Sequence, residues 1–326
     1  MLDEIKEYLG QDWTDTIGLI RSSLQSDIDL LNYTNEAILS NAGKQLRPML
    51  SLLVARACSG GKAAKDSIAF AAAAELLHNA TLLHDDVVDQ SKLRRGAPTV
   101  VSILGGPASV LIGDFWLVKA MDNILSSSDK GSYMIRVFAK TLSDLAEGEM
   151  LQLQKADSGD TDESDYLRII YSKTASLFEA AALSGAHSVA APDEYVESVR
   201  NYAVSLGIAF QIRDDMFDYS DAKVIGKPVG IDLEEQKITL PLLGALSTVD
   251  AEKAADIRRK VVEIHEHPEY KDEVKAFVLG NNGLAYSEKK LEEYVGKAID
   301  ALSILPDSKE KDYLATIARF TGKRKK

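Results

Sequence analysis

The sequence of 326 residues contains a single cysteine, Cys58. One cysteine cannot form an internal disulfide and provides no cluster of thiolates for zinc, so a disulfide-stabilised secreted domain and a cysteine-ligated zinc module are both excluded. The first ten residues, MLDEIKEYLG, include early acidic residues and lack the apolar core of a secretory signal. We therefore expect a protein of a reducing compartment and assign it to the cytoplasm.

Basic residues are in the minority, with 38 Lys and Arg against 50 Asp and Glu and a formal net charge of −12. A surface that neutralises nucleic-acid phosphates needs an excess of Lys and Arg, so we expect no nucleic-acid partner. The only basic cluster, residues 323–326, forms a tail rather than a groove. No apolar run reaches the roughly 18 residues of a membrane span, because the nearest candidate, 68–83, is interrupted by Glu75, His78 and Asn79.

Signals for β-strands are missing from the chain. Runs that alternate apolar and polar residues between Asn-Gly or Asp-Gly turns do not occur, and most of the 8 prolines lie between periodic segments. Apolar residues instead recur at spacings of three and four, which predicts an all-α protein with about a dozen helices. The predicted helices span about residues 12–33, 47–59, 64–90, 107–126, 132–155, 163–188, 193–219, 239–247, 251–265, 270–280, 285–304 and 308–321.

The domain organisation follows from the breaks between these helices. None of the breaks is long or biased enough to be an interdomain linker, and no repeat of 20–50 residues is present. We therefore predict one large helical domain over residues 1–326. Two segments, 68–83 and 175–191, are apolar on nearly all sides, which predicts core helices surrounded by others.

Two matching aspartate clusters are the strongest chemical signal. Residues 85–89 read DDVVD and residues 214–218 read DDMFD, and each cluster ends an otherwise apolar helix. The first and last aspartates of each cluster share one helical face, where like charges repel unless a cation binds. Carboxylate oxygens suit Mg²⁺, which commonly lies between a few carboxylates and substrate phosphates. The predicted metal ligands are Asp85, Asp86, Asp89, Asp214, Asp215 and Asp218.

Side chains that suit a diphosphate ligand accompany both clusters. A guanidinium group can donate two hydrogen bonds at once to phosphate oxygens, and a lysine offers a point charge. His78 extends the face of Asp85 two turns back, and Gln211 shares the face of Asp214. The candidate substrate-binding residues are Lys44, Arg47, His78, Arg94, Arg95, Lys173, Thr174, Gln211, Lys227 and Lys237.

The order of these motifs resembles a known family. The chain has G-K-x-x-R-P at 43–48, H-x-x-x-x-x-H-D-D-x-x-D at 78–89 with R-R-G soon after, K-T at 173–174, and then F-Q-x-x-D-D-x-x-D and G-K-P-x-G-x-D-L. This is similar to the pattern of the all-trans isoprenyl diphosphate synthases, and it looks most like their long-chain octaprenyl diphosphate synthase type. Ala42 and Gln45 depart from the residues common in that family, while Lys44 and Arg47 are retained.

The resemblance implies a single-domain, isoprenoid synthase-like helical bundle around a deep central cavity. It also implies a homodimer that condenses isopentenyl diphosphate with an allylic diphosphate, farnesyl diphosphate being the expected primer. Two or three Mg²⁺ ions would bind with the allylic diphosphate, and the product would serve as a quinone side chain, with transient membrane contact on its release. Among the site residues, Asp85, Asp89, Lys173, Asp214 and Asp218 would be catalytic.

The expected product is about eight isoprene units long, as the resemblance to the octaprenyl enzymes implies. Thr81 lies one turn below Asp85, and Ala80 is one residue further along the helix. Both are small, so a growing chain is not blocked there. Phe138 is the candidate floor of the cavity by resemblance to the long-chain enzymes.

Other functions use part of this pattern. A class I terpene cyclase or a squalene-synthase-like coupler also uses D-D-x-x-D, but neither needs the second cationic group of Lys44, Arg47, Arg94 and Arg95. A shorter-chain geranylgeranyl or farnesyl diphosphate synthase stays open. A non-catalytic subunit of a heteromeric synthase also stays open, although such subunits usually lose aspartates or cations, and both clusters are complete here.

Overall fold

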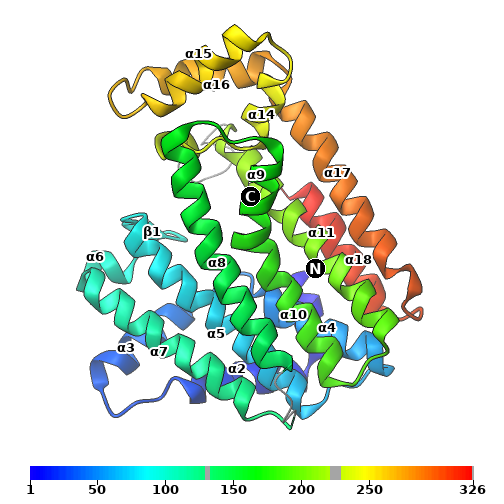
Figure 1. The fold of residues 1–326 in the computed structure, drawn as a ribbon. Helices are drawn as coiled ribbons and strands as arrows, with labels where there is room; N and C mark the ends of the chain where they lie inside the picture. Colours follow the sequence, from blue (N-terminus) through cyan, green and yellow to red (C-terminus); the bar gives the residue numbers. More distant parts are fainter. Residues whose placement is uncertain (129–132, 221–228, 325–326) are drawn as a thin grey trace. The chain divides into compact units, whose positions relative to one another are not determined.

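The computed structural model describes residues 1–128, 133–220 and 229–324, and over these residues the chain is almost entirely helical (Figure 1). The predicted all-α class is thereby confirmed. The elements are α1 (Leu2–Leu9), α2 (Gln11–Ser23), α3 (Asp29–Ser40), α4 (Leu46–Ser59), α5 (Lys65–Val88), β1 (Leu93–Arg94), β2 (Ala97–Pro98), α6 (Val100–Leu104), α7 (Gly106–Leu125), α8 (Tyr133–Ser158), α9 (Glu163–Ile170), the π-helix η1 (Tyr171–Ala175), α10 (Ser176–Ser188), α11 (Asp193–Asp218), α13 (Ile231–Glu234), α14 (Leu240–Leu246), α15 (Ala251–Val262), α16 (Tyr270–Gly280), α17 (Gly283–Ala301), the 3₁₀-helix η2 (Leu302–Ile304) and α18 (Lys309–Lys323).

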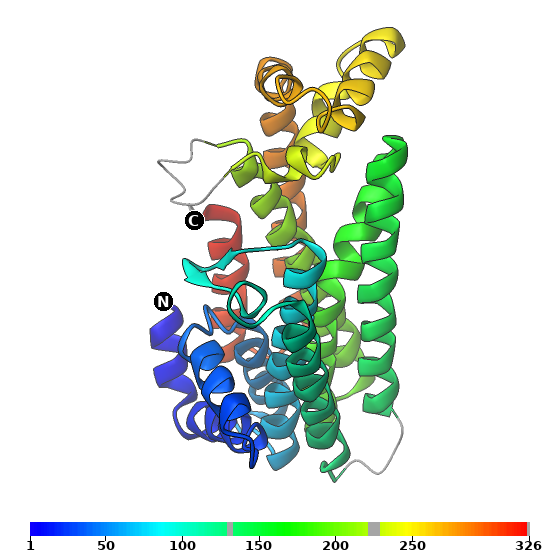
Figure 2. The same ribbon diagram turned by 90° about the vertical axis from the view of Figure 1, so that its left-hand side faces the viewer.

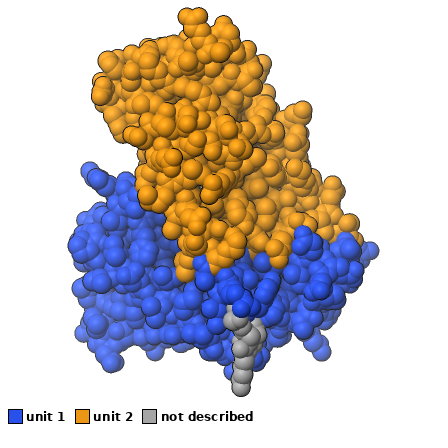
Figure 3. Space-filling model, in the orientation of Figure 1, with its two compact units in different colours: residues 1–139, 180–199, 304–314 blue, residues 140–179, 200–303, 315–326 orange. Residues whose placement is uncertain are grey.

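The chain divides into two compact units, each assembled from three chain segments (Figure 3). Unit 1 comprises residues 1–139, 180–199 and 304–314, and the remaining segments form unit 2. The first aspartate cluster belongs to unit 1 and the second to unit 2. That the whole chain acts as one domain stays a prediction.

Helix α5 is the central helix of unit 1 and packs against α2, α4 and α7. Phe70 and the alanines of 71–74 have no exposed surface, so apolar side chains are buried on every side of the helix. Alanines allow neighbouring helices to approach closely, and burial of the surrounding apolar surface stabilises the packing. The sequence prediction of a surrounded apolar helix over 68–83 is confirmed.

The N-terminal region departs from the prediction of one helix over 12–33, because a connection separates α2 from α3. The Asn32 side chain donates to Ser26 O (2.6 Å) and accepts from Ser26 N (3.0 Å). An asparagine that bonds the backbone in this way competes with helix formation, so the chain turns before α3 begins.

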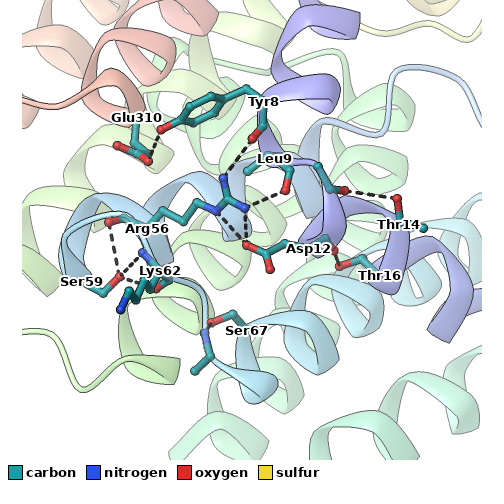
Figure 4. Close-up of polar contacts among 12 residues, drawn as sticks. Tyr8, Leu9, Asp12, Thr14, Thr16, Arg56, Ser59, Lys62, Ser67 and Glu310 are labelled. Atoms are coloured by element: carbon teal, nitrogen blue, oxygen red, sulfur yellow. Dashed lines mark hydrogen bonds and ion pairs between the residues drawn. The ribbon is translucent and has the colours of Figure 1, made fainter.

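The predicted helix list also missed α1, whose C-terminal carbonyls are bound by a side chain of α4. Arg56 donates to Tyr8 O (3.1 Å) and Leu9 O (2.7 Å) and pairs with Asp12 at 2.5 Å (Figure 4). These carbonyls at a helix end have no partner within the helix. The guanidinium therefore joins α1, α2 and α4 at one point.

A short hairpin follows α5, where the sequence predicts only a break. Strands β1 and β2 pair antiparallel (Figure 2). The two residues of the turn between them, Arg95 and Gly96, have φ angles of 53° and 80°. Positive φ at both central residues is the geometry of a type I′ turn, the usual turn of two-residue hairpins. Such a turn favours glycine, which here occupies the second position. The turn places two consecutive arginines, Arg94 and Arg95, at the hairpin tip.

Unit 2 has its own apolar core, to which α9, α11, α14, α15, α16 and α17 contribute. Helix α14 packs closely on α17 (Figure 1), where a Cβ on Gly283 would lie 2.2 Å from Pro241 O. Glycine therefore permits a backbone approach that a larger residue would prevent. Within the described parts of both units, no helix is long and apolar enough to span a membrane.

Candidate active site

The first aspartate cluster lies at the C-terminal end of α5. Asp89 is the C-cap residue, and its backbone N–H donates to Asp85 O at 2.8 Å, so the two aspartates are one helical turn apart. Asp86 is buried, and Arg94 donates to its Oδ1 through Nε and Nη2, both at 2.9 Å. Burial raises the pKa of the Asp86 carboxyl, whereas the Arg94 charge lowers it. The hairpin arginine thus neutralises the middle aspartate of the cluster.

The second hairpin arginine reaches the loop before α4. Arg95 Nη1 donates to Asn41 O at 2.9 Å. A Cβ on Gly43 would lie 2.5 Å from Arg95 Cζ, and Gly43 has a φ of 69°. Both the contact and the conformation require glycine at this position. Lys44 follows in the same loop, so the structure brings Lys44 and Arg95 into one region of unit 1.

Arg47, on the first turn of α4, faces a charged group on α5. Burial lowers the pKa of Arg47 to about 10, and the charge of Glu75 opposes this effect. Burial, followed by the charges of Arg47, Arg95 and Arg94, lowers the pKa of His78 well below its usual value. His78 is therefore neutral near pH 7 and can donate one hydrogen bond.

Glu75 is a residue of this region that sequence reasoning did not assign. Its side chain is 2% exposed, and Asn79 Nδ2 donates to its Oε1 at 3.3 Å. Burial raises the pKa of Glu75, and the charge of Arg47 lowers it. The available signal was a carboxylate inside an otherwise apolar run of α5, since buried carboxylates normally have a charged partner.

The second aspartate cluster ends α11, and its middle residue is buried. Asp215 accepts hydrogen bonds from Tyr166 Oη (2.7 Å) and from Gln211 Nε2 (2.8 Å). Thr174 Oγ1 in turn donates to Gln211 Oε1 at 2.8 Å. Burial raises the pKa of Asp215, while these two donors lower it. Thr174 and Gln211 therefore form a chain of hydrogen bonds that ends on Asp215.

Asp218 bonds the backbone of the segment that follows the cluster. Its two oxygens accept from Ile231 N and Asp232 N, each at 3.0 Å. Burial, followed by the charges of Asp215 and Asp218, raises the pKa of Asp232 well above its usual value. Asp232 was not assigned from the sequence, although it stands in the G-K-P-x-G-x-D-L motif.

Lys173 lies in η1, where one turn of π-helix interrupts the helix predicted over 163–188. Its Nζ pairs with Glu149 Oε1 at 2.6 Å and donates to Gln152 Oε1 at 3.0 Å, both on α8. A π-helical turn shifts the side chains that follow it around the helix axis and is frequent at functional sites.

A pocket in unit 2 is lined both by an aspartate of the second cluster and by lysines. The pocket is partly open to solvent. Both signs of charge line it, since Lys155, Lys173 and Lys237 stand with Asp215 and Asp232. Such a lining suits an anion bound together with a cation. The predicted Lys227 lies outside the described residues.

The aspartates fit a divalent cation by their chemistry. Over the described ranges, no group of three His, Cys, Asp or Glu side chains is arranged to hold a metal ion. The carboxylates instead bond Arg94, Tyr166, Gln211 and backbone amides. Mg²⁺ needs only one or two carboxylates when phosphates and water complete its shell, so this donor set is suitable.

The three residues expected to set product length all belong to unit 1. Ala80 on α5 is 1% exposed, and Phe138 on α8 has no exposed surface. Thr81 is half-buried, and its hydroxyl donates to His78 O at 2.9 Å. The hydroxyl is thus satisfied within α5, so Thr81 presents no unpaired polar group to an apolar chain.

Comparison with known proteins agrees with this chemistry. The family model described as "Polyprenyl synthetase" matches residues 28–278. The octaprenyl diphosphate synthase of Escherichia coli (strain K12) is 38% identical over 325 residues, which cover 99% of both chains.

Solved structures extend the similarity to the whole fold. A decaprenyl diphosphate synthase from Rhodobacter capsulatus superposes with a TM-score of 0.93 at 32% identity and covers 100% of both chains. A polyprenyl synthase from Caulobacter crescentus, complexed with calcium and isoprenyl diphosphate, gives a TM-score of 0.91 at 32% identity over 100% of this chain and 98% of that chain. The protein therefore has the all-α isoprenoid synthase fold. It belongs to the polyprenyl synthetase family and is a prenyltransferase.

Proposed function

We propose that this enzyme condenses isopentenyl diphosphate with an allylic diphosphate, preferably farnesyl diphosphate, and extends it to an all-trans product of about eight isoprene units. The observation that carries the proposal is that aspartates end an apolar helix in each unit, with arginines or lysines beside them. The length follows the octaprenyl diphosphate synthase that is 38% identical over nearly the whole chain.

The two diphosphates need separate cationic groups. Lys44, Arg47, His78 and Arg95 hold isopentenyl diphosphate, because these residues gather around the start of α4 and the adjoining part of α5. Neutral His78 donates a hydrogen bond to a phosphate oxygen, and Glu75 provides the buried charge opposite Arg47. The residues that hold the allylic diphosphate are Arg94, Lys173, Lys227 and Lys237.

The aspartates would hold two or three Mg²⁺ ions with the allylic diphosphate, since carboxylate oxygens suit this ion. A relative complexed with calcium and isoprenyl diphosphate supports this assignment. When bound, these ions neutralise the diphosphate as its bond to the allylic carbon breaks. Lys173 adds a fixed positive charge to the same leaving group. Thr174 and Gln211 act through Asp215, since their hydrogen bonds end on its carboxylate.

The remaining steps need no protein nucleophile. Binding both substrates in line brings the double bond of isopentenyl diphosphate against the allylic carbon that becomes cationic. The diphosphate leaving group accepts the proton that restores a double bond. The apolar interior excludes water, which would otherwise capture the cation. The product would leave by transient membrane contact, because its long hydrocarbon chain is insoluble, and would supply the side chain of a quinone.

A second copy of this chain covers one face of α7. Leu111, Val118 and Leu125 follow one another at intervals of seven residues and are 69%, 56% and 64% exposed. Side chains at this spacing form a continuous stripe, which buries well against the same stripe of a symmetry-related helix. The homodimer implies a solution mass twice the 35.5 kDa of one chain. The cytoplasm is proposed as its compartment.

The decisive experiment is incubation with labelled isopentenyl diphosphate, farnesyl diphosphate and Mg²⁺, followed by removal of phosphate and chromatography of the alcohols. A product near eight units supports the proposal. Products of three or four units would identify a short-chain enzyme. Absence of product from folded, dimeric protein would point to a subunit that needs a partner. Omission of Mg²⁺ with added chelator should abolish turnover.

A further inference from the structure

The basic C-terminal tail contains a buried arginine. Arg324, which follows α18, has only 5% of its side chain exposed. Its Nη2 lies 2.9 Å from Asp214 Oδ1 and donates to Phe210 O at 2.8 Å. Asp214, the first residue of the second cluster, is 39% exposed. Arg324 is therefore fixed on the cluster.

Aromatic rings on α11 fix the plane of the guanidinium. Its Cζ lies 3.9 Å from the centroid of the Phe210 ring and 5.4 Å from that of Phe217. Phe210, Asp214 and Phe217 are spaced by four and three residues, so they share one face of the helix. The planar guanidinium of Arg324 therefore stacks on aromatic rings and pairs with a carboxylate on the same helical face.

A separate contact holds Gly322, in the last turn of α18. Arg213 donates to Gly322 O and pairs with Glu288 Oε1 at 2.9 Å. Neither partner belongs to the aspartate cluster. The end of α18 therefore has an anchor that does not involve Asp214, so loss of the Arg324 side chain does not by itself release the end of this helix.

We propose that Arg324 is a positioning residue that serves as the internal cation of Asp214 until a divalent ion binds the cluster. This inference rests on the proposed function of the cluster as a cation site. Asp214, Asp215 and Asp218 share one helix end, and Asp232 lies against them, so their charges repel. Arg324 offsets one of these charges and orients Oδ1, which leaves Oδ2 for the ion.

Thermodynamic linkage predicts an effect on stability that can be measured without turnover. If Arg324 offsets the charge of Asp214 in the metal-free protein, its removal destabilises that state and strengthens the response to a divalent ion. A role in packing alone lowers the stability with and without the ion by the same amount. The test therefore compares the melting temperature in chelator with that in rising Mg²⁺, without substrate.

The key variant is Arg324→Gln. We expect its metal-free melting temperature to fall by about 2–4 °C. We expect Mg²⁺ to raise it by more than in the wild type, with a half-saturating concentration lower by about fivefold, the factor of a partly exposed ion pair. Lys323→Gln removes the same charge from the exposed neighbouring residue and should match the wild type.

Two further variants separate charge from packing. Arg324→Lys keeps the charge and loses the planar stacking, so its metal-free stability should fall while its Mg²⁺ response stays near that of the wild type. In an Asp214→Asn background, Arg and Gln at position 324 should give the same Mg²⁺-induced shift in melting temperature, which a double-mutant cycle detects. Equal Mg²⁺-induced shifts in wild type and Arg324→Gln would overturn the proposal. Failure of the proposed function appears instead as absence of product from the wild-type enzyme.

Discussion

Gly148 on α8 lies directly against Ser172 of the π-helical turn, where a Cβ at position 148 would be 2.6 Å from Ser172 Cβ. On α11, a Cβ at Gly207 would be 2.5 Å from Ala175 Cα. Two glycines from different helices therefore enclose the turn that carries Lys173. The wide π-helical turn fits because neither neighbour has a side chain at the point of contact.

Gly148→Ala tests whether this close packing positions Lys173. Alanine normally stabilises a helix by up to ~1 kcal/mol over glycine. Here the added methyl group overpacks the turn, and we expect a net loss of about 1–2 kcal/mol in the free energy of unfolding together with lower turnover. Gly296→Ala on α17 is the matched control, since no atom lies within 4 Å of its Cβ position. Denaturant titration measures the free energy of unfolding of both variants. A Gly148→Ala variant more stable than the wild type would contradict the prediction.

Sequence periodicity predicts the buried core helices but not the π-helical turn. The apolar runs of α5 and α10 predict buried helices, because burial on all sides leaves no polar face in the sequence. The turn at 171–175 was missed because Lys173-Thr174 fits a continuous helix equally well. Its geometry depends on Gly148 and Gly207, which are distant in sequence.

The two aspartate clusters predict a strong effect of single substitutions. Asp85→Ala or Asp214→Ala should lower turnover by roughly 10²-fold or more, because each removes a ligand that stabilises developing charge on the leaving group. Both residues are only partly buried at helix ends, so circular dichroism should report an intact helical fold. Asp300→Ala, at an exposed position on α17, provides the control for loss of one negative charge. Near-wild-type turnover in a folded variant would exclude the metal role for that aspartate.

Lys44 tests the assignment of the two diphosphates. Lys44→Ala should raise the KM for isopentenyl diphosphate by about tenfold, the effect of losing one charged hydrogen bond, with a smaller change for the allylic substrate. Lys62→Ala removes an exposed lysine of the same unit and should leave both KM values unchanged. Initial rates with each substrate varied in turn distinguish the two. A change confined to the allylic KM would reverse the assignment.

Residues that position the aspartates from other parts of the chain were harder to predict than the motifs themselves. The clusters and the G-K-x-x-R-P segment are local patterns. Tyr166 contacts Asp215 from 49 residues away, and Arg324 reaches Asp214 from the far end of the chain. Such pairs appear only when the fold places two helices together, since neither residue stands out among its sequence neighbours.

His78 predicts a pH dependence of stability. Burial, then the charge of Arg47, keeps its pKa in the folded protein well below the usual value of 6.5. The unfolded chain therefore binds a proton that the folded protein rejects, and stability falls as the pH drops below about 6.5. His78→Gln stays neutral and lacks this loss. The melting temperature of the wild type should fall relative to that of His78→Gln between pH 7.5 and 5.5. A difference that is constant with pH would contradict the shift.

Product length tests the path of the growing hydrocarbon chain. A chain whose diphosphate is bound at Asp85 extends down the same helix, and Ala80 lies about 7.5 Å below that aspartate along the helix axis. A tyrosine or phenylalanine at position 80 would block the path near its top, so the product should shorten to about three or four units. Because Ala80 is 1% exposed, the ring also overpacks the core, and the melting temperature must be measured.

Thr81→Phe provides the companion variant at the half-buried neighbouring position and should shorten the product with a smaller loss of stability. Phe138→Ala acts at the other end of the path. Removal of its buried ring opens a cavity, which should lengthen the product if the ring is the floor and should destabilise the fold by about 3–5 kcal/mol. Chromatography of the dephosphorylated products measures all three variants. An unchanged product distribution in folded Ala80→Tyr and Thr81→Phe would show that the chain does not pass along α5, and the assignment of Phe138 would be lost with it.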